Sequence, residues 1–189
     1  MKHLNDIIQE SILDDTDKIT TDADIAIIED WLIKHDAVKF DIDPKTHVIN
    51  SNYLNIGVDE PIPPYIKFGN VRAFRFTWEG KAKDVVLRLP ETCQKMTMDV
   101  FDCDSFEMVG EIDTPEVRIY GDFKKLILPK KVSTYKLDLS PCKELEEVDG
   151  LDKVKAEILN LPYKLCGIVI KDALKTKAKN LAVCGNSLT

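Results

Sequence analysis

A short apolar motif recurs at a nearly constant interval through the later part of this chain. The motif is an apolar-x-apolar triplet, and its successive copies are separated by 24, 19, 20, 22 and 22 residues. The copies are Phe74/Phe76, Met98/Val100, Val117/Ile119, Leu137/Leu139, Leu159/Leu161 and Leu181/Val183. A unit of this length cannot bury its own apolar face, so the copies must stack on one another.

A second apolar run lies between successive triplets and supplies another strand for each unit. These runs fall at residues 86–89, 106–112, 126–128, 148–151 and 168–170, and prolines and glycines recur beside them. Such residues are typical of chain reversals. The pattern therefore predicts an irregular β-solenoid over residues 70–189.

The residues before the repeats divide into two segments. Residues 1–23 combine a short amphipathic stretch with an acidic linker, and residues 24–69 carry a helical apolar pattern followed by alternating, strand-like residues. A solenoid needs a covered end, and the predicted helix at 24–35 can provide that cover. We therefore expect an α/β protein in which a small, helix-containing N-terminal cap closes an irregular β-solenoid.

The residue between the two apolar positions of each triplet must point away from the core, because side chains alternate across a strand. If the triplets stack in register, four of these residues form an exposed ladder of alternating charge, which neighbouring strands favour. The outward residues are Arg75, Asp99, Arg118, Asp138, Asn160 and Ala182. The first five are the predicted binding residues.

Part of the repeat resembles a known family. The segment Leu137-Asp-Leu-Ser-Pro-Cys142-Lys-Glu-Leu145 resembles the leucine-rich repeat pattern L-x-L-x-x-N/C-x-x-L, and residues 98–106 and 181–188 are similar to it. Asp122 and Lys164 replace the Asn or Cys in the other two units, which departs from a regular horseshoe. The segment 145–154 looks like the linking segment of degenerate repeat proteins in tailed phages and gut bacteria. The resemblance implies a leucine-rich-repeat-like stack.

The first eleven residues, MKHLNDIIQES, are similar to the leader that directs cargo proteins into phage proheads. In that family a protease cuts after a Glu preceded two residues earlier by Ile or Leu. The resemblance implies Ile8 and Glu10 as cleavage residues and a virion structural or internal cargo protein. An ordinary docking helix is the alternative.

Charge and cysteine usage exclude several classes of function. The net charge is −7, and residues 1–60 carry 14 acidic against 5 basic side chains, which argues against a nucleic-acid partner. No apolar run is long enough to span a membrane, and no secretory signal is present, so the expected location is a bacterial or infected cytoplasm, or a virion. The five cysteines and three histidines lack metal-site spacing. We expect no metal and no cofactor.

Acidic residues on one unit suggest an enzymatic alternative. Asp99, Asp102 and Asp104 lie close together in sequence, and Asp122 and Asp138 could add partners from neighbouring coils. Paired carboxylates of this kind cleave glycosidic bonds. Solvated turn positions and the charge ladder explain the same residues without catalysis, so the chain is expected not to be an enzyme.

The predicted function is a non-catalytic protein-protein interaction module that presents the stacked strand face. The repeat strand at 181–183 is predicted to leave an open C-terminal edge, at which Leu181 and Val183 would mediate self-association. The expected partners are an unidentified protein and a second copy of the chain, with no membrane.

Overall fold

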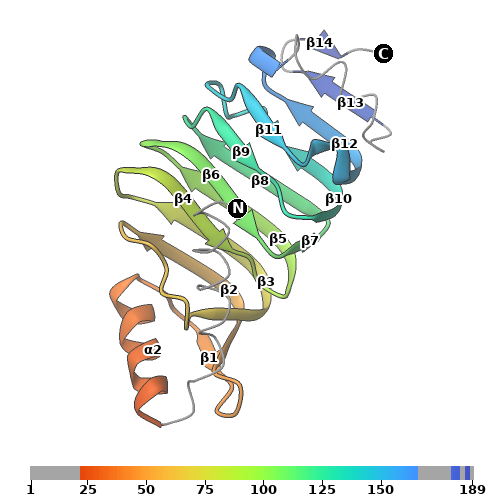
Figure 1. The fold of residues 1–189 in the computed structure, drawn as a ribbon. Coiled ribbons are helices and arrows are strands. Elements are labelled where there is room, and N and C mark those ends of the chain that lie inside the picture. Colours follow the sequence, from red (N-terminus) through yellow and green to blue (C-terminus); the bar gives the residue numbers. More distant parts are fainter. Residues whose placement is uncertain (1–21, 166–179, 184–185, 188–189) are drawn as a thin grey trace, which may run out of the picture.

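The computed structural model describes residues 22–165, 180–183 and 186–187. Most of these residues form strands, which stack as parallel coils of a β-solenoid of about 5 turns with a helix at the N-terminal end (Figure 1). The expected fold class is confirmed. The elements are α2 (Asp22–Lys34), β1 (Phe40–Ile42), β2 (Val48–Val58), β3 (Lys67–Trp78), β4 (Ala82–Arg88), β5 (Thr92–Val100), β6 (Cys103–Val109), β7 (Glu111–Asp113), β8 (Glu116–Gly121), β9 (Lys125–Ile127), β10 (Lys131–Asp138), β11 (Glu147–Asp149), η2 (Leu151–Lys153), β12 (Val154–Leu161), η3 (Tyr163–Leu165), β13 (Asn180–Val183) and β14 (Asn186–Ser187).

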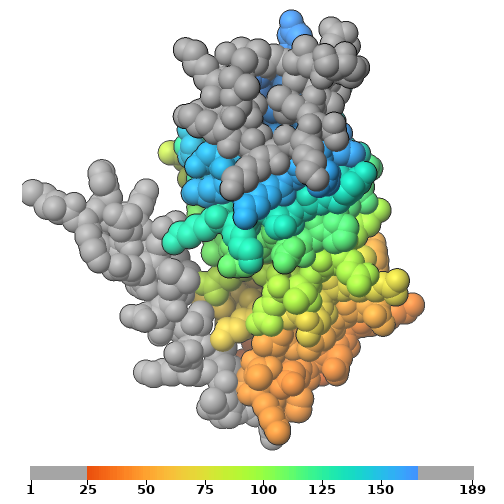
Figure 2. Space-filling view, turned by 90° about the vertical axis from the view of Figure 1, so that its right-hand side faces the viewer, coloured from red at the N-terminus to blue at the C-terminus, as the bar shows by residue number. Residues whose placement is uncertain are grey.

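Two sheets run along the solenoid. Sheet A has the order β1-β2-β3-β5-β8-β10-β12-β13-β14, with β7 also beside β10, and sheet B has the order β11-β9-β6-β4. The strands from β2 to β13 pair in parallel, as do those of sheet B. Each central coil therefore places one strand in each sheet, as the two apolar runs per unit predict, and successive coils are visible as coloured bands in Figure 2.

The core lies between the two sheets and is continuous from coil to coil. Phe106 of β6 is fully buried; its ring is stacked on Phe76 of sheet A at 6.4 Å and an interplanar angle of 4°. The ring of Phe123, in the turn after β8, lies 5.7 Å from Phe106. Apolar side chains from neighbouring coils thus complete one another's packing, because no single coil encloses a core of its own.

The register of sheet A differs from the predicted one at two interfaces. Phe76 of β3 lies opposite Met98 of β5, and Met98 lies opposite Ile119 of β8, so the predicted alignment is wrong by two residues at both places. From β8 to β13 the predicted alignment is confirmed. The residues of one buried row are Leu54, Phe74, Met96, Val117, Leu137 and Leu159, with spacings of 20, 22, 21, 20 and 22. Leu181 of β13 pairs with Leu159 in the same register.

A bend at the same place in successive coils accompanies this register. At the bend, consecutive buried residues are three positions apart instead of two, so one extra residue stands on the outer side. These pairs are Val71/Phe74, Cys93/Met96, Thr114/Val117, Thr134/Leu137 and Ala156/Leu159. The Thr134 hydroxyl donates to the carbonyls of Lys136 (3.1 Å) and Pro115 (3.2 Å), and the Cys93 thiol donates to that of Lys95 at 3.0 Å. Small polar side chains thereby satisfy carbonyls at the bend.

The solenoid begins earlier than residue 70. Strand β2 pairs in parallel with β3 from Val48 to Val58, with a register shift between Ile49 and Ser51. The predicted boundary, which assigned residues 24–69 to the cap, is therefore wrong. Residues 48–58 carry the same alternating apolar pattern as the later strands, but the prolines at 61–64 made them look separate from the repeats.

The cap consists of α2 and β1. Ile28, Trp31 and Leu32 of the helix are buried, and β1 pairs antiparallel with β2 only over Ile49 to Ser51. The Nδ1 atom of His35 lies 2.8 Å from the carbonyl oxygen of Gly57, so the imidazole can donate to a backbone group on the edge of β2 that β1 does not reach. Burial of the apolar helix face and this contact hold the cap on the first coil.

The C-terminal edge is not placed as predicted. Strand β13, which contains Leu181 and Val183, pairs in parallel with β12 on one side and antiparallel with β14 at Ala182 and Val183 on the other. The outermost strand of sheet A among the described residues is thus β14, which has two residues. The predicted open edge at β13 is wrong, because the chain reverses and covers it.

Candidate functional site: the outer face of sheet A

The outward side chains of sheet A form two neighbouring rows that follow from the register. Arg75, Thr97, Arg118 and Asp138 lie opposite one another on β3, β5, β8 and β10, and Asn160 continues this row on β12. The neighbouring row, two residues earlier on each strand, contains Tyr53, Ala73, Lys95, Glu116, Lys136 and Ile158. We call the outward side chains of these strands the sheet A face.

The predicted charge ladder is present in altered form. Asp99 lies opposite Thr77, not Arg75, yet Arg75 reaches it diagonally: Nε donates to Oδ2 at 3.0 Å and Nη2 lies 2.8 Å from the same oxygen. Thr97 separates Arg75 from Arg118. The expected single row of alternating charges is therefore wrong, although Arg75 and Asp99 do form an ion pair.

A second group of charges joins β5, β8 and β10. Glu116 Oε2 lies 3.6 Å from Lys95 Nζ, and Glu116 Oε1 lies 3.4 Å from Arg118 Nη2. Asp138 Oδ2 lies 3.2 Å from Lys136 Nζ and 3.8 Å from Arg118 Nε. These contacts cross three adjacent strands, so the charged groups hold one another in position.

Neighbouring groups stabilise the charged forms of both arginines. The hydroxyl of Tyr120, which accepts from Arg118 Nη1 at 3.2 Å, raises the pKa of Arg118, with smaller contributions from Glu116 and Asp138. The hydrogen bond to Asp99 raises the pKa of Arg75. Both guanidinium groups therefore stay charged at neutral pH.

Asp138 is buried, which corrects the prediction that it is exposed. Burial opposes ionisation of its carboxyl, but the Ser140 hydroxyl, which donates to Oδ1 at 2.6 Å, and Lys136 outweigh burial and lower the pKa of Asp138. A buried carboxylate under a lysine therefore anchors this part of the face.

We expect Asp138→Asn to lower the free energy of unfolding at pH 7 by about 1–3 kcal/mol, because hydrogen bonds and ion pairs to a charged group are lost. The folded-state pKa of Asp138 is lowered, so its contribution is present above the ordinary value of 3.8 and is lost as the pH falls through the folded-state pKa. The difference between wild type and variant should therefore shrink below about pH 4. Urea denaturation across pH 3–7 measures this difference in the free energy of unfolding. Asp113→Asn, at an exposed position, is the control. A difference between wild type and Asp138→Asn that does not change with pH would contradict a lowered pKa for Asp138.

Within each ion pair on this face the basic side chain is more exposed than the acidic one. The side chains of Arg75, Lys95, Arg118 and Lys136 are 51%, 60%, 38% and 27% exposed, whereas those of Asp99, Glu116 and Asp138 are 16%, 32% and 10% exposed. Tyr53 and Tyr135 are also exposed, at 48% and 60%. The sheet A face thus presents cations and tyrosines, with carboxylates beneath them.

Several of these residues were not among the predicted site residues. Lys95, Glu116, Lys136 and Tyr53 lie one row away from the predicted ladder, and Tyr135 stands at the outer side of the bend. The sequence signals only part of this row: a charged residue stands two positions before Arg118 and Asp138, namely Glu116 and Lys136. Asn160 lies in the expected row and is half-buried.

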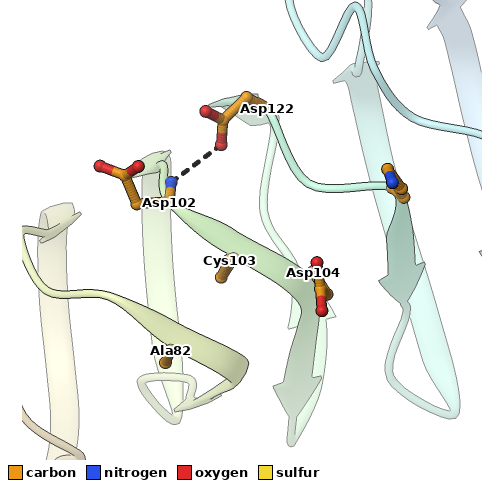
Figure 3. A pocket seen from close by; sticks show the side chains of 6 residues that line it. Ala82, Asp102, Cys103, Asp104 and Asp122 are labelled. Carbon is orange, nitrogen blue, oxygen red and sulfur yellow. Dashed lines mark hydrogen bonds between the residues drawn. The ribbon is translucent and has the colours of Figure 1, made fainter.

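A shallow depression lies between the turns that join the two sheets, and acidic residues dominate its lining. Its volume is about 240 Å³, and its lining residues are Ala82, Asp102, Cys103, Asp104, Asp122 and Lys124 (Figure 3). The carboxylate of Asp122 accepts from the backbone N–H of Asp102 at 2.9 Å, and Asp102 has a left-handed φ of 57°. Asp122 therefore serves to hold the turn.

The chemistry of this depression is that of a solvated turn. Burial and then the carboxylates of Asp122 and Asp104 raise the pKa of the Cys103 thiol to about 12, which disfavours a nucleophilic thiolate. Among the described residues, no group of side chains could hold a metal ion. Asp99 and Asp138, which the enzymatic alternative combined with these carboxylates, instead lie on the sheet A face.

Cys103 and Cys142 occupy the same position of the leucine-rich-repeat-like segments 98–106 and 137–145, but the register separates them in the structure. Because Met96, not Met98, aligns with Leu137 along the buried row, the residue that corresponds to Cys142 in the β5 coil is Phe101 and not Cys103. Cys142 is buried and its thiol donates to the carbonyl of Ile119 at 3.3 Å. Cys142 thus joins two coils, whereas Cys103 is half-buried at the start of β6.

The predicted cleavage residues Ile8 and Glu10 lie outside the described residues. In the part of the chain that the structure describes, no helix has the length and apolar character needed to cross a membrane. Comparison of the chain with protein-family models, curated proteins and solved structures gives no match.

Proposed function

We propose that the protein is a non-catalytic binding module and that the sheet A face is its protein-binding surface. The observation that carries the proposal is the layer of exposed basic and tyrosine side chains on adjacent strands, supported from below by carboxylates. Arginine and tyrosine are enriched at protein-protein interfaces, where they combine apolar contact with directed hydrogen bonds.

The scaffold beneath this surface favours the same function. The outward side chains stand on strands whose backbones are paired on both sides, and ion pairs between strands restrict their rotation. A surface that is ordered before binding loses less conformational entropy when a partner binds. The face therefore suits the recognition of a partner of fixed shape.

A photo-reactive amino acid at Thr97 tests the proposal in cells that express the protein. Thr97 lies between Arg75 and Arg118, so the probe reports on this face without removing a charged residue. The same probe at Val86, which is exposed on the outer face of sheet B, is the matched control. We expect a discrete cross-linked protein at Thr97 and a substantially weaker one at Val86.

The double variant Arg75→Gln/Arg118→Gln should reduce the yield of the Thr97 adduct at least about tenfold, which corresponds to the loss of about 1.4 kcal/mol of binding free energy. Lys125→Gln removes a cation that pairs with Glu147 and Asp149 on sheet B, and it should leave the yield unchanged. Equal adducts at Thr97 and Val86, or an adduct insensitive to the arginines, would refute the proposed binding surface.

A further inference from the structure

We infer that the segment recognised by the sheet A face is an acidic α-helix of a partner protein, lying across the strands along the solenoid axis. This inference rests on the proposed function and adds the chemistry and geometry of the partner. It follows from the positions of four cations on four adjacent strands and from the lower exposure of the carboxylates paired with them.

The sign of the exposed charge selects an acidic partner. Arg75, Lys95, Arg118 and Lys136 form the outer layer, whereas Asp99, Glu116 and Asp138 are the less exposed members of their ion pairs. A carboxylate that approaches the face meets guanidinium and ammonium groups first. Arginine can bind such a carboxylate with two parallel hydrogen bonds.

The spacing of the cations matches a helix. They stand on β3, β5, β8 and β10, which are successive neighbours in sheet A, one cation on each strand. Adjacent strands are about 4.8 Å apart, so the four cations span about 14 Å along the axis. A helix rises about 1.5 Å per residue, so residues at i, i+3, i+7 and i+10 span about 15 Å.

The lateral arrangement agrees with the same geometry. Arg75 and Arg118 lie in one row, and Lys95 and Lys136 lie in the row two residues earlier, so the cations alternate between two rows. Residues at i, i+3, i+7 and i+10 of a helix alternate in the same way about the centre of one face. An extended segment places same-side residues about 6.7 Å apart, so three steps would span about 20 Å and lose register with the strands.

The charge balance of this ion-pair group favours a helix over a nucleic acid. Its four cations and the three carboxylates paired with them sum to +1, in a chain whose net charge is −7. A nucleic acid brings a phosphate at every nucleotide and depends on net positive charge. A helix can carry carboxylates on the stripe that faces the cations and neutral residues on either side of that stripe. Tyr53 and Tyr135 can make apolar contact with these neutral residues.

Titration of the ¹⁵N-labelled full chain with synthetic peptides at low salt tests the inference. The probe is an alanine-based helical peptide with glutamates at i, i+3, i+7 and i+10, and the control peptide has the same composition with its glutamates spread around the helix. We expect the striped peptide to shift backbone amide signals of β3, β5, β8 and β10 and to bind at least about tenfold more tightly than the control, a difference of about 1.4 kcal/mol.

The same titration with two variants of the protein supplies the matched comparison. Arg75→Gln/Arg118→Gln should abolish the shifts, and Lys125→Gln, on sheet B, should retain them. Equal binding of the two peptides, absence of binding, or tighter binding of a thymidine oligonucleotide of equal charge would overturn the inference. If the probe at Thr97 gives a cross-linked protein but the striped peptide does not bind, only the acidic helix is refuted. If the probe at Thr97 gives no cross-linked protein when both arginines are present, the binding surface itself is refuted.

Discussion

Phe106→Ala should lower the free energy of unfolding by about 3–5 kcal/mol, the range found when a fully buried aromatic ring is truncated. The ring of Phe106 has no exposed surface, and it contacts Phe76 of sheet A and Phe123 of the turn after β8. Its removal opens a cavity between the two sheets that neither backbone can close, because both are held by strand pairing on each side.

The measurement is chemical denaturation followed by circular dichroism. Because each coil contacts only its neighbours, the variant should also show a broader transition as the coils on either side separate into two cooperative units. Val86→Ala, on the exposed side of the adjacent strand β4, is the control and should change stability by no more than about 0.5 kcal/mol. A cost below about 1.5 kcal/mol for Phe106→Ala would contradict the assigned core.

Gly121→Ala should destabilise the protein by about 3 kcal/mol, although it adds a single methyl group. A Cβ atom at this position would lie 2.2 Å from the carbonyl oxygen of Val100 and 2.4 Å from the ring of Phe123. The carbonyl belongs to β5, whose backbone pairs with both β3 and β8, so it cannot move aside without breaking the sheet.

Gly57→Ala is the matched control on β2. The nearest atom to its added Cβ would be Oε1 of Glu79, at 2.5 Å, and Glu79 is an exposed, flexible side chain that can turn away. Replacement of glycine in a strand also gains about 0.5–1 kcal/mol from the unfolded state, so Gly57→Ala should be nearly neutral. Similar denaturation midpoints for the two variants would contradict the close packing at Gly121.

The solenoid and the outer face were predictable because both depend on the two-residue alternation of strands. Arg75, Asp99, Arg118 and Asp138 all point outward, as their apolar neighbours in sequence require. Four of the second apolar runs became the strands of sheet B for the same reason, and the fifth, at 168–170, lies outside the described residues. On either side of the bend, alternation decides which face a residue occupies, and it is visible in a single strand.

The register was not predictable from alternation. A shift of two residues leaves every side chain on the same face, so the pairs Met96/Met98 and Met98/Val100 fit the core pattern equally well. The three-residue step between Cys93 and Met96, which recurs between Thr134 and Leu137, distinguishes them, because stacked bends must coincide. The same two-residue shift moved Asp99 out of the row of Arg75 and separated Cys103 from the position of Cys142.

The sequence by itself determined a stack of coils, the buried and outward faces of its strands, and a helix that covers the first coil. The tertiary structure decided the start of the stack at β2, the reversal of the chain from β13 into β14, and the layering of cations over carboxylates on the sheet A face. The physical reason is the range of the interactions. Alternation and helix periodicity act within one element, whereas register, edge pairing and the relative burial of two charges depend on contacts between residues about 20 positions apart.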